Sequence, residues 1–211
     1  MIHLPLWFWI ATAVLLFWVV GAYNRLVRLR ADITQSFAAV EAHIRQREAS
    51  LSQWLESAAQ GLSEGLSEVT GEGQGQGSAA HAVAALRAAC NQVLVAVDVA
   101  SKSPCAAKAM ASLRLAEEVL IGARGRLSTE LAAQAHLHSQ PEPQPRPEPQ
   151  AQPQPEWNSV LQADELAALD GSLGFARRQF NHAAQLYNDA ATQFPTWVVA
   201  GVFGFRAAGL L

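Results

Sequence analysis

The first thirty residues constrain this chain more than any other part of it. A run without charged residues extends from Leu4 to Ala22 and ends at Tyr23-Asn24. A helix of about 19 residues is about 29 Å long, close to the roughly 30 Å hydrocarbon thickness of a bilayer. The sequence therefore predicts a transmembrane anchor over residues 1–23.

Arginines at positions 25, 28 and 30 follow this run and predict its orientation. The other side carries only the amino terminus and His3, so the positive-inside rule places the rest of the chain in the cytoplasm. A cleaved signal peptide is the alternative, but no basic region precedes the run and the run is longer than usual. We expect a single-pass protein of the bacterial inner (cell) membrane, with the N-terminus outside and the bundle in the cytoplasm.

The segment after the anchor has the pattern of a long helix. No proline or glycine occurs from Ala22 to Gln60, so the membrane helix should continue without a break. Apolar residues recur every seven positions in two rows, which predicts a coiled-coil-type seam. The rows are Leu26, Ile33, Val40 and Trp54, and Phe37, Ile44, Leu51 and Ala58. Arg47 is the one exception on this seam.

Two more helices are predicted after a glycine-rich stretch, residues 61–77, that suits a flexible linker. The first extends from Ala79 to Lys102, and Ser103-Pro104 suits an N-cap followed by proline at the first position of the next helix. That next helix should end near His138. The apolar seam residues are Val83, Leu86, Cys90, Val93 and Val97 in one helix and Leu113, Leu120 and Leu127 in the other. Residues 24–138 thus supply three bundle helices.

The two cysteines, Cys90 and Cys105, do not predict a disulfide. A hairpin turning near Ser103 offsets them by about 15 Å along the helix axis, beyond the distance that a disulfide spans. Both are expected to be small core residues in a reducing compartment.

Residues 139–156 alternate proline with glutamine, glutamate and arginine, which predicts a disordered, proline-rich linker. We interpret it as a spacer, although Pro143 and Pro147 could also anchor it in an aromatic groove. Residues 157–211 then form the last bundle helix, ended by Pro195, and an apolar C-terminal tail. This helix has one row of large residues beside a row of mostly small ones, which lets neighbouring helices approach closely. The first row is Leu166, Leu173, Phe180, Tyr187 and Phe194, and the second is Leu169, Ala176, Ala183 and Ala190.

Motifs at both ends of the chain resemble the LemA family. The first is Tyr23-Asn24-Arg25-Leu26-Val27-Arg28-Leu29-Arg30 directly after the span, with Arg45 and Arg47 further on. The second runs from Ala176-Arg177-Arg178-Gln179-Phe180-Asn181 through Tyr187-Asn188, Phe194-Pro195 and Val199-Ala200 to Phe203-Gly204-Phe205. Ser52-Gln53 stands where a Pro-Asn pair is common in the family, and Phe180-Asn181 where Tyr-Asn is usual. The resemblance implies a single-pass anchor, an antiparallel helical bundle and no established catalytic activity.

The predicted fold class is therefore all-α, with an N-terminal transmembrane helix that continues into an antiparallel bundle of four-helix type. No catalytic, cofactor-binding or metal-ligating residues and no cofactors are expected. His136 and His138 point to different faces of a helix, and Glu117-Glu118 lacks the Glu-x-x-His partners of a di-metal bundle. Asn181 and Asn188, seven residues apart, are expected to hydrogen-bond a neighbouring helix or water, with helix capping or bridging as the alternative.

The predicted function is that of a scaffold or adaptor acting through protein–protein or membrane-surface contacts, without catalysis. A regulatory subunit of a membrane enzyme, such as a protease or transporter, is the alternative, and a hydrolase is a third hypothesis. The expected partners are the lipid bilayer and proteins that the sequence does not identify. Self-association through the seam stays open. A net charge of -3, with no basic stripe, excludes nucleic-acid binding. The tail Trp197–Phe205 should return toward the membrane, where it caps the bundle or lies in the lipid interface.

Overall fold

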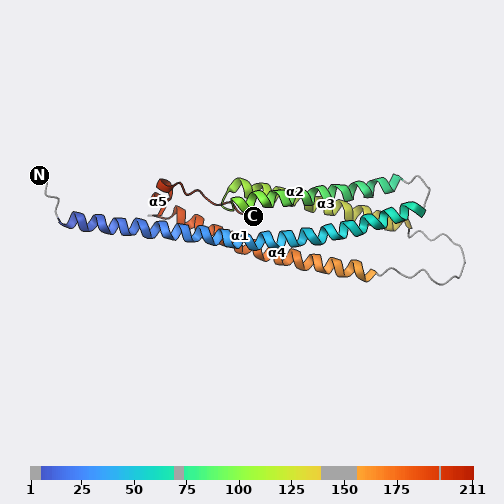
Figure 1. The fold of residues 1–211 in the computed structure, drawn as a ribbon, viewed down its shortest axis with the longest axis horizontal. Coiled ribbons are helices and arrows are strands. Elements are labelled where there is room, and N and C mark those ends of the chain that lie inside the picture. The colour runs from blue at the N-terminus through green and yellow to red at the C-terminus, as the bar shows by residue number, and fades with distance from the viewer. Residues whose placement is uncertain (1–5, 69–73, 139–155, 195) are drawn as a thin grey trace. The chain divides into compact units, whose positions relative to one another are not determined.

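The structure, a computed structural model, describes residues 6–68, 74–138, 156–194 and 196–211 (Figure 1). The described residues contain helices and no strand, so the predicted all-α class is confirmed. The helices are α1 (Leu6–Glu68), α2 (Gln74–Lys102), α3 (Ala107–His138), α4 (Glu156–Thr192) and α5 (Thr196–Phe203).

Both predicted linkers fall wholly or partly outside the described residues. The proline-rich segment 139–156 contributes only Glu156, the first residue of α4, so Pro143 and Pro147 lie outside, as does Pro195. Helices α1 and α2 cover most of the glycine-rich segment 61–77 and leave residues 69–73 outside.

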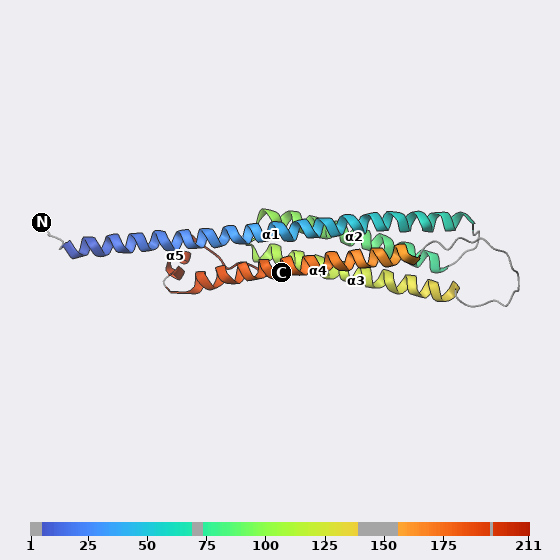
Figure 2. The ribbon, with the colours of Figure 1, turned by 90° about the horizontal axis from the view of Figure 1, so that it is seen from below.

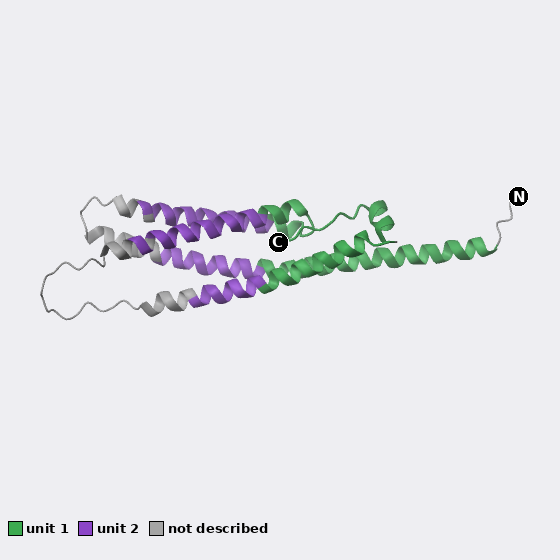
Figure 3. Cartoon of the chain, turned by 180° about the vertical axis from the view of Figure 1, so that it is seen from behind, with its two compact units in different colours: residues 1–41, 99–112, 175–211 green, residues 42–98, 113–174 purple. Residues whose placement is uncertain are grey.

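The chain divides into two compact units (Figure 3), each assembled from separate segments. Unit 1 contains Met1–Glu41, Val99–Ser112 and Phe175–Leu211, and unit 2 contains Ala42–Asp98 and Leu113–Gly174.

Unit 2 is an antiparallel four-helix bundle, and its contacts define the direction of each helix. Arg45 of α1 pairs with Asp98 of α2, whereas Leu51 of α1 shares a cavity with Leu86, so α1 and α2 are antiparallel. The contacts of Arg47 and Leu51 with α3 and α4 show in the same way that α3 runs parallel to α1 and that α4 runs antiparallel to both. The four segments lie side by side in this unit (Figure 2). This up-down-up-down order is the predicted bundle topology.

The predicted seam forms most of the core of unit 2. The buried seam residues are Ile44 and Leu51 of α1, Val83, Leu86, Cys90, Val93 and Val97 of α2, Leu113, Leu120 and Leu127 of α3, and Leu169 and Leu173 of α4. Trp54 and Leu166 are only half-buried, because both border a small cavity between the helices. The side chain of Ala58 lies outside the described part.

In unit 1, α1 packs against the second half of α4. Leu26, Ile33, Phe37 and Val40 are buried on α1, and the rings of Phe37 and Phe180 meet edge to face with their centroids 5.7 Å apart. Two predictions for α4 were wrong: Ala184 is fully buried in place of Ala183, and Phe194 is 80% exposed. Ala184 lies four residues after Phe180 and three before Tyr187, so it shares their buried face. Phe194 also lies beyond Thr192, where α4 ends.

The turn between α2 and α3 differs from the predicted one. The Ser103 amide donates to the Ala100 carbonyl and the Ala106 amide donates to the Ser103 carbonyl, which adds an extra turn after α2. Helix α3 therefore begins at Ala107 rather than at Pro104. The Met110 amide donates the first hydrogen bond of this helix to the Ala106 carbonyl, at 3.1 Å. The predicted N-cap role of Ser103 was wrong, because its main-chain carbonyl closes the turn instead.

Candidate functional site

The first turns of α1 carry apolar side chains that the rest of the described chain leaves uncovered. Between Leu6 and Val20 every large apolar residue except the half-buried Val19 is exposed, from 39% at Trp18 to 81% at Phe17. Two stretches, Leu6–Ser57 and Ala80–Lys102, are long and apolar enough to cross a membrane by length and composition alone. In Ala80–Lys102, 44% of the most apolar 18 residues are buried, as in a core helix. In Leu6–Ser57, only 6% of the most apolar 18 residues are buried. The N-terminal segment is therefore compatible with membrane anchoring.

Helix α5 lies beside α1 directly after this apolar segment. The Tyr23 ring contacts the rings of Phe203 and Phe205, with centroid distances of 5.1 Å and 5.9 Å. Val199 and Ala200 face inward, and the outward apolar residues are Trp197, Val198, Val202 and Phe203. The predicted return of the tail to the start of the first helix is confirmed within unit 1. The sequence placed Tyr23 at the border of the span and in the first motif of the family resemblance, but it did not predict the contact of Tyr23 with this tail.

Gly204 turns the chain out of α5. Its φ of 71° lies in the left-handed region that favours glycine. The Phe205 amide donates to the Ala200 carbonyl at 2.9 Å, which is the closing bond of a Schellman motif with glycine at the position after the cap. The chain therefore reverses and continues along α4 without helical structure.

Two asparagines of α4 hold this returning tail by its main chain. The Asn188 side chain exchanges two hydrogen bonds with Ala208, at 2.7 Å and 3.1 Å. The Asn181 side chain does the same with Leu211, at 2.7 Å and 2.8 Å. Seven helical residues rise about 10.5 Å and three extended residues span about 10 Å, so the two pairs match in spacing.

These bonds correct the prediction for the asparagines: their partner is the C-terminal tail rather than a neighbouring helix or water. The Tyr187 hydroxyl donates to the Arg206 carbonyl at 3.0 Å and adds a third point of attachment. Gly209 passes so close to α3 that a Cβ atom there would stand 2.7 Å from the Ala107 Cα. The tail is thus built into unit 1, whereas Asn24 is exposed.

Unit 2 contains a cluster of charged side chains at the exceptional seam position, Arg47. Its guanidinium lies 3.0 Å from the Glu48 carboxylate, 3.5 Å from Glu117 and 3.6 Å from Asp170. The other oxygen of Asp170 pairs with Arg124 at 3.1 Å. Arg47, Glu48 and Glu117 are all buried, so one guanidinium pairs with two carboxylates where water is largely excluded, and the second oxygen of Glu48 has no hydrogen-bond partner among the described residues. We refer to these five residues as the charge cluster.

The charge cluster borders Cys90, since Glu48 and Arg47 both act on the Cys90 thiol. Burial, together with the neighbouring Glu48 carboxylate, raises the pKa of the Cys90 thiol to about 12, so the thiol stays protonated. Both cysteines are free, as expected. Cys105 is half-buried, and burial also raises its pKa while the Arg30 guanidinium opposes that rise.

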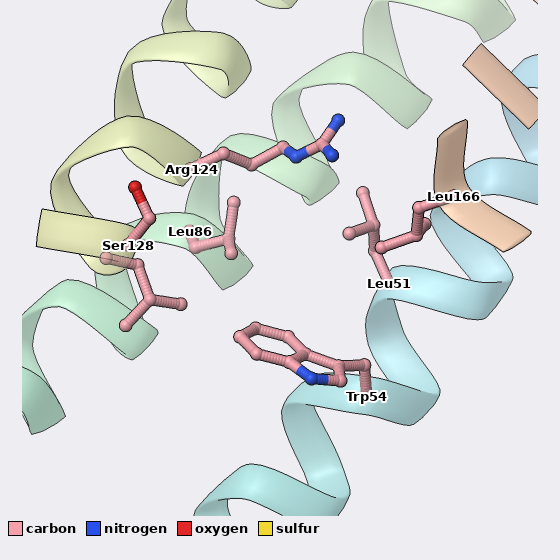
Figure 4. A pocket seen from close by; sticks show the side chains of 7 residues that line it. Leu51, Trp54, Leu86, Arg124, Ser128 and Leu166 are labelled. Atoms are coloured by element: carbon pink, nitrogen blue, oxygen red, sulfur yellow. The ribbon is translucent and has the colours of Figure 1, made fainter. Parts of the chain in front are cut away.

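The cavity between the four helices of unit 2 is small and mostly apolar (Figure 4). Its volume is about 180 Å³, below the roughly 300–1,000 Å³ of typical small-molecule sites. Leu51, Leu86 and Leu166 reach it from three helices, and the Trp54 indole and Arg124 lie at its edge. We interpret it as a packing gap.

The acidic and histidine residues considered for metal binding are dispersed. Glu117 belongs to the charge cluster, while Glu118 faces solvent and pairs with Arg114 at 4.0 Å. His136 and His138 lie at the end of α3, where the structure does not describe side chains. Within the described residues, no group of three or more histidine, cysteine, aspartate or glutamate residues is arranged to hold a metal ion.

Arg177 and Arg178, which belong to the closing motif, lie on α4. The Arg178 guanidinium stands 6.0 Å from the centre of the exposed Phe175 ring, in a cation–π arrangement on the surface of the same helix.

Comparison with known proteins supports the resemblance to LemA. The model of the LemA family matches residues 156–211, which include α4, α5 and the clamped tail. This match confirms the resemblance predicted from the closing motif. No curated protein and no solved structure matches the chain.

Proposed function

We propose that this chain, similar to the LemA family over its last quarter, is a single-pass membrane-anchored helical bundle that acts as a scaffold or adaptor without catalysis. The observation that supports membrane anchoring is the uncovered apolar surface of α1 from Leu6 to Val20. Burying such a surface in lipid removes it from water, at about 25 cal/mol for each Å².

The proposal includes an orientation in the bacterial inner membrane. Arg25, Arg28 and Arg30 follow the apolar segment, so the bundle should lie in the cytoplasm and the N-terminus outside. Protease added outside intact spheroplasts should then leave the chain whole. Digestion to a short fragment under these conditions would contradict the cytoplasmic placement.

Exposed aliphatic side chains on α2 and α3 support the part of the proposal that concerns protein contacts. Val95 is 63% exposed on α2, and Leu115 and Val119 are 58% and 43% exposed on α3. Leu115 and Val119 are four residues apart and share one helix face. We define the contact face as Val95, Leu115 and Val119.

Proximity labelling in cells tests this part. A labelling enzyme inserted between residues 140 and 155 avoids the clamped C-terminus, and the labelled proteins are compared with those of a Leu115→Lys/Val119→Lys variant. The variant should lose the labelled set while keeping its helicity. The matched control, Ala168→Lys, places a lysine on an exposed position of α4 and should keep the set.

The composition of the labelled set separates the two candidate roles. Several unrelated proteins are expected for a scaffold, whereas one dominant membrane protease or transporter would favour the regulatory subunit instead. A labelled set unchanged by Leu115→Lys/Val119→Lys would contradict docking at the contact face. Turnover of a substrate by the purified chain would contradict the absence of catalysis.

A further inference from the structure

Unit 1 contains a cavity of about 460 Å³ whose charged lining residues are all cationic. Arg30 comes from α1, Lys102 is the last residue of α2, and Arg206 belongs to the tail after α5. The hydroxyl groups of Thr34, Ser101 and Ser103 complete the polar lining, and no carboxylate side chain is among the lining residues. We call this the cationic cavity.

The structure fixes the main chain of two of the three cationic residues, which come from separate elements. The Arg206 main chain accepts a hydrogen bond from the Tyr187 hydroxyl at 3.0 Å, and the Asn188 clamp fixes the tail two residues later. Arg30 lies on a helix and acts electrostatically on both Cys105 and Tyr187, which line the same cavity. The cations are thus brought together by the fold rather than by closeness in sequence.

Arg30, Lys102 and Arg206 are exposed to solvent, which screens their mutual repulsion, and an anion bound in the cavity would be attracted by all three. A phosphate group suits this arrangement, because its oxygens accept several charge-assisted hydrogen bonds from arginine and lysine at once. The Ser103 hydroxyl adds a neutral donor, whereas the Thr34 hydroxyl already donates to the Arg30 carbonyl at 3.1 Å. The volume accommodates a phosphate and its polar substituent, since typical ligand sites begin at about 300 Å³.

The position of Arg30 favours a phosphate that belongs to a lipid. Arg30 follows Ala22, the end of the apolar run, by eight residues, or about 12 Å of helix. The headgroup layer occupies roughly 5–8 Å beyond the hydrocarbon. Side chains on a helix lean toward its N-terminus, so the long Arg30 side chain points back toward that layer. We propose that the cationic cavity binds the phosphate headgroup of an anionic phospholipid.

The native Cys105, which lines the cavity, reports on occupancy. The full chain is placed in nanodiscs of phosphatidylcholine alone or of phosphatidylcholine with phosphatidic acid, and alkylation by N-ethylmaleimide is followed at each cysteine by mass spectrometry. We expect Cys105 to react about tenfold more slowly in the anionic nanodiscs, the effect of one or two charge-assisted hydrogen bonds. Inorganic phosphate added to neutral nanodiscs should protect it less.

Charge variants show whether the protection is specific to the cavity. Arg206→Gln and Lys102→Gln should each remove most of the difference between the two nanodiscs. Arg28→Gln is the matched control, because Arg28 is an exposed cation on the same helix as Arg30 and does not line the cavity. It should keep the difference.

Three results would overturn the proposal. One is equal alkylation of Cys105 in both nanodiscs. Another is an Arg28→Gln variant that loses protection as completely as Arg206→Gln, which would indicate general surface charge. The third is protection by inorganic phosphate but not by phosphatidic acid, which would assign the cavity to a soluble ligand. None of these depends on the set of labelled proteins, so the lipid site and the scaffold role fail independently.

Discussion

Arg47 occupies a position that the heptad pattern reserves for an apolar residue, and its surroundings show why the exception is tolerated. An isolated buried charge is costly, but here the Arg47 guanidinium pairs with the buried Glu48 and Glu117 carboxylates and with the partly exposed Asp170. A bundle that slid by one turn would separate these partners. The charge cluster therefore favours one register of the four helices in unit 2.

Replacing Arg47 with alanine should destabilise the protein by about 3–5 kcal/mol, because the Glu48 carboxylate stays buried without its arginine. Arg45→Ala is the control on the same helix, since the Arg45–Asp98 pair is exposed to solvent and should contribute at most about 1 kcal/mol. Urea unfolding in detergent, followed by circular dichroism, measures both. Similar losses for the two variants would contradict the role assigned to the charge cluster.

The raised pKa of Cys90 predicts how the stability of the protein changes at alkaline pH. The unfolded thiol titrates near pH 9.0, whereas the folded thiol titrates near pH 12, so the unfolded state loses this proton first. The stability contributed by the protonated thiol is complete below about pH 9 and falls by about 1.4 kcal/mol for each pH unit between there and the folded pKa of about 12. A Cys90→Ala variant should lose less stability between about pH 8 and pH 11 in urea titrations. Parallel losses would argue against the raised pKa.

At the scale of the helices, periodicity in the sequence predicted the structure well where contacts repeat and poorly where they do not. The seam residues of α1, α2 and α3 were mostly correct because each lies one or two turns from the next. The turn before Ala107 was misplaced because main-chain bonds, rather than the Ser103 side chain, form it. The partners of Arg47 were missed because Glu117 and Asp170 come from distant helices, and one sequence does not reveal that pairing.

The seam of α4 is tested by two phenylalanines from the same predicted row. Phe180 is fully buried against Phe37, so Phe180→Ala should cost about 3–5 kcal/mol. Phe194 is 80% exposed, and Phe194→Ala should change stability by no more than about 0.5 kcal/mol. Thermal melts of the two variants in the same detergent provide the comparison. Equal midpoints would contradict the observed difference in burial.

The sequence predicted an apolar tail. It did not predict how the tail is held, because the hydrogen bonds come from asparagines that are distant along the chain. Asn188→Asp keeps the shape of the side chain but removes the amide that donates to the Ala208 carbonyl. We expect a loss of about 1–3 kcal/mol. Asn24→Asp, at an exposed position, should be nearly neutral. Hydrogen exchange at the Ala208 amide gives a second measurement and should accelerate only in Asn188→Asp.

At the scale of the whole molecule, the sequence predicted an apolar anchor and a tail that returns to it, and the contact of Tyr23 with Phe203 agrees with that return. The cationic cavity was not predicted, because Arg30, Lys102 and Arg206 lie far apart in the sequence and become neighbours only in the fold. The structure therefore reveals groups of residues that lie far apart in the sequence but close together in the fold. The proposed anchor and the proposed lipid site would lie at the same membrane surface.

The outward face of α5 separates a tail that lies in lipid from one that only caps unit 1. Val202 is 76% exposed, and Trp197 and Phe203 are each more than half exposed, a composition typical of interfacial helices. A spin label at Val202→Cys, with Cys90 and Cys105 replaced by alanine, should be relaxed more strongly by oxygen, which partitions into lipid, than by a water-soluble nickel complex. The control is Ala168→Cys on an exposed position of α4, where the nickel complex should dominate. If the nickel complex dominated at Val202 as well, α5 would face water, and its apolar residues would have to be assigned to contact with another protein.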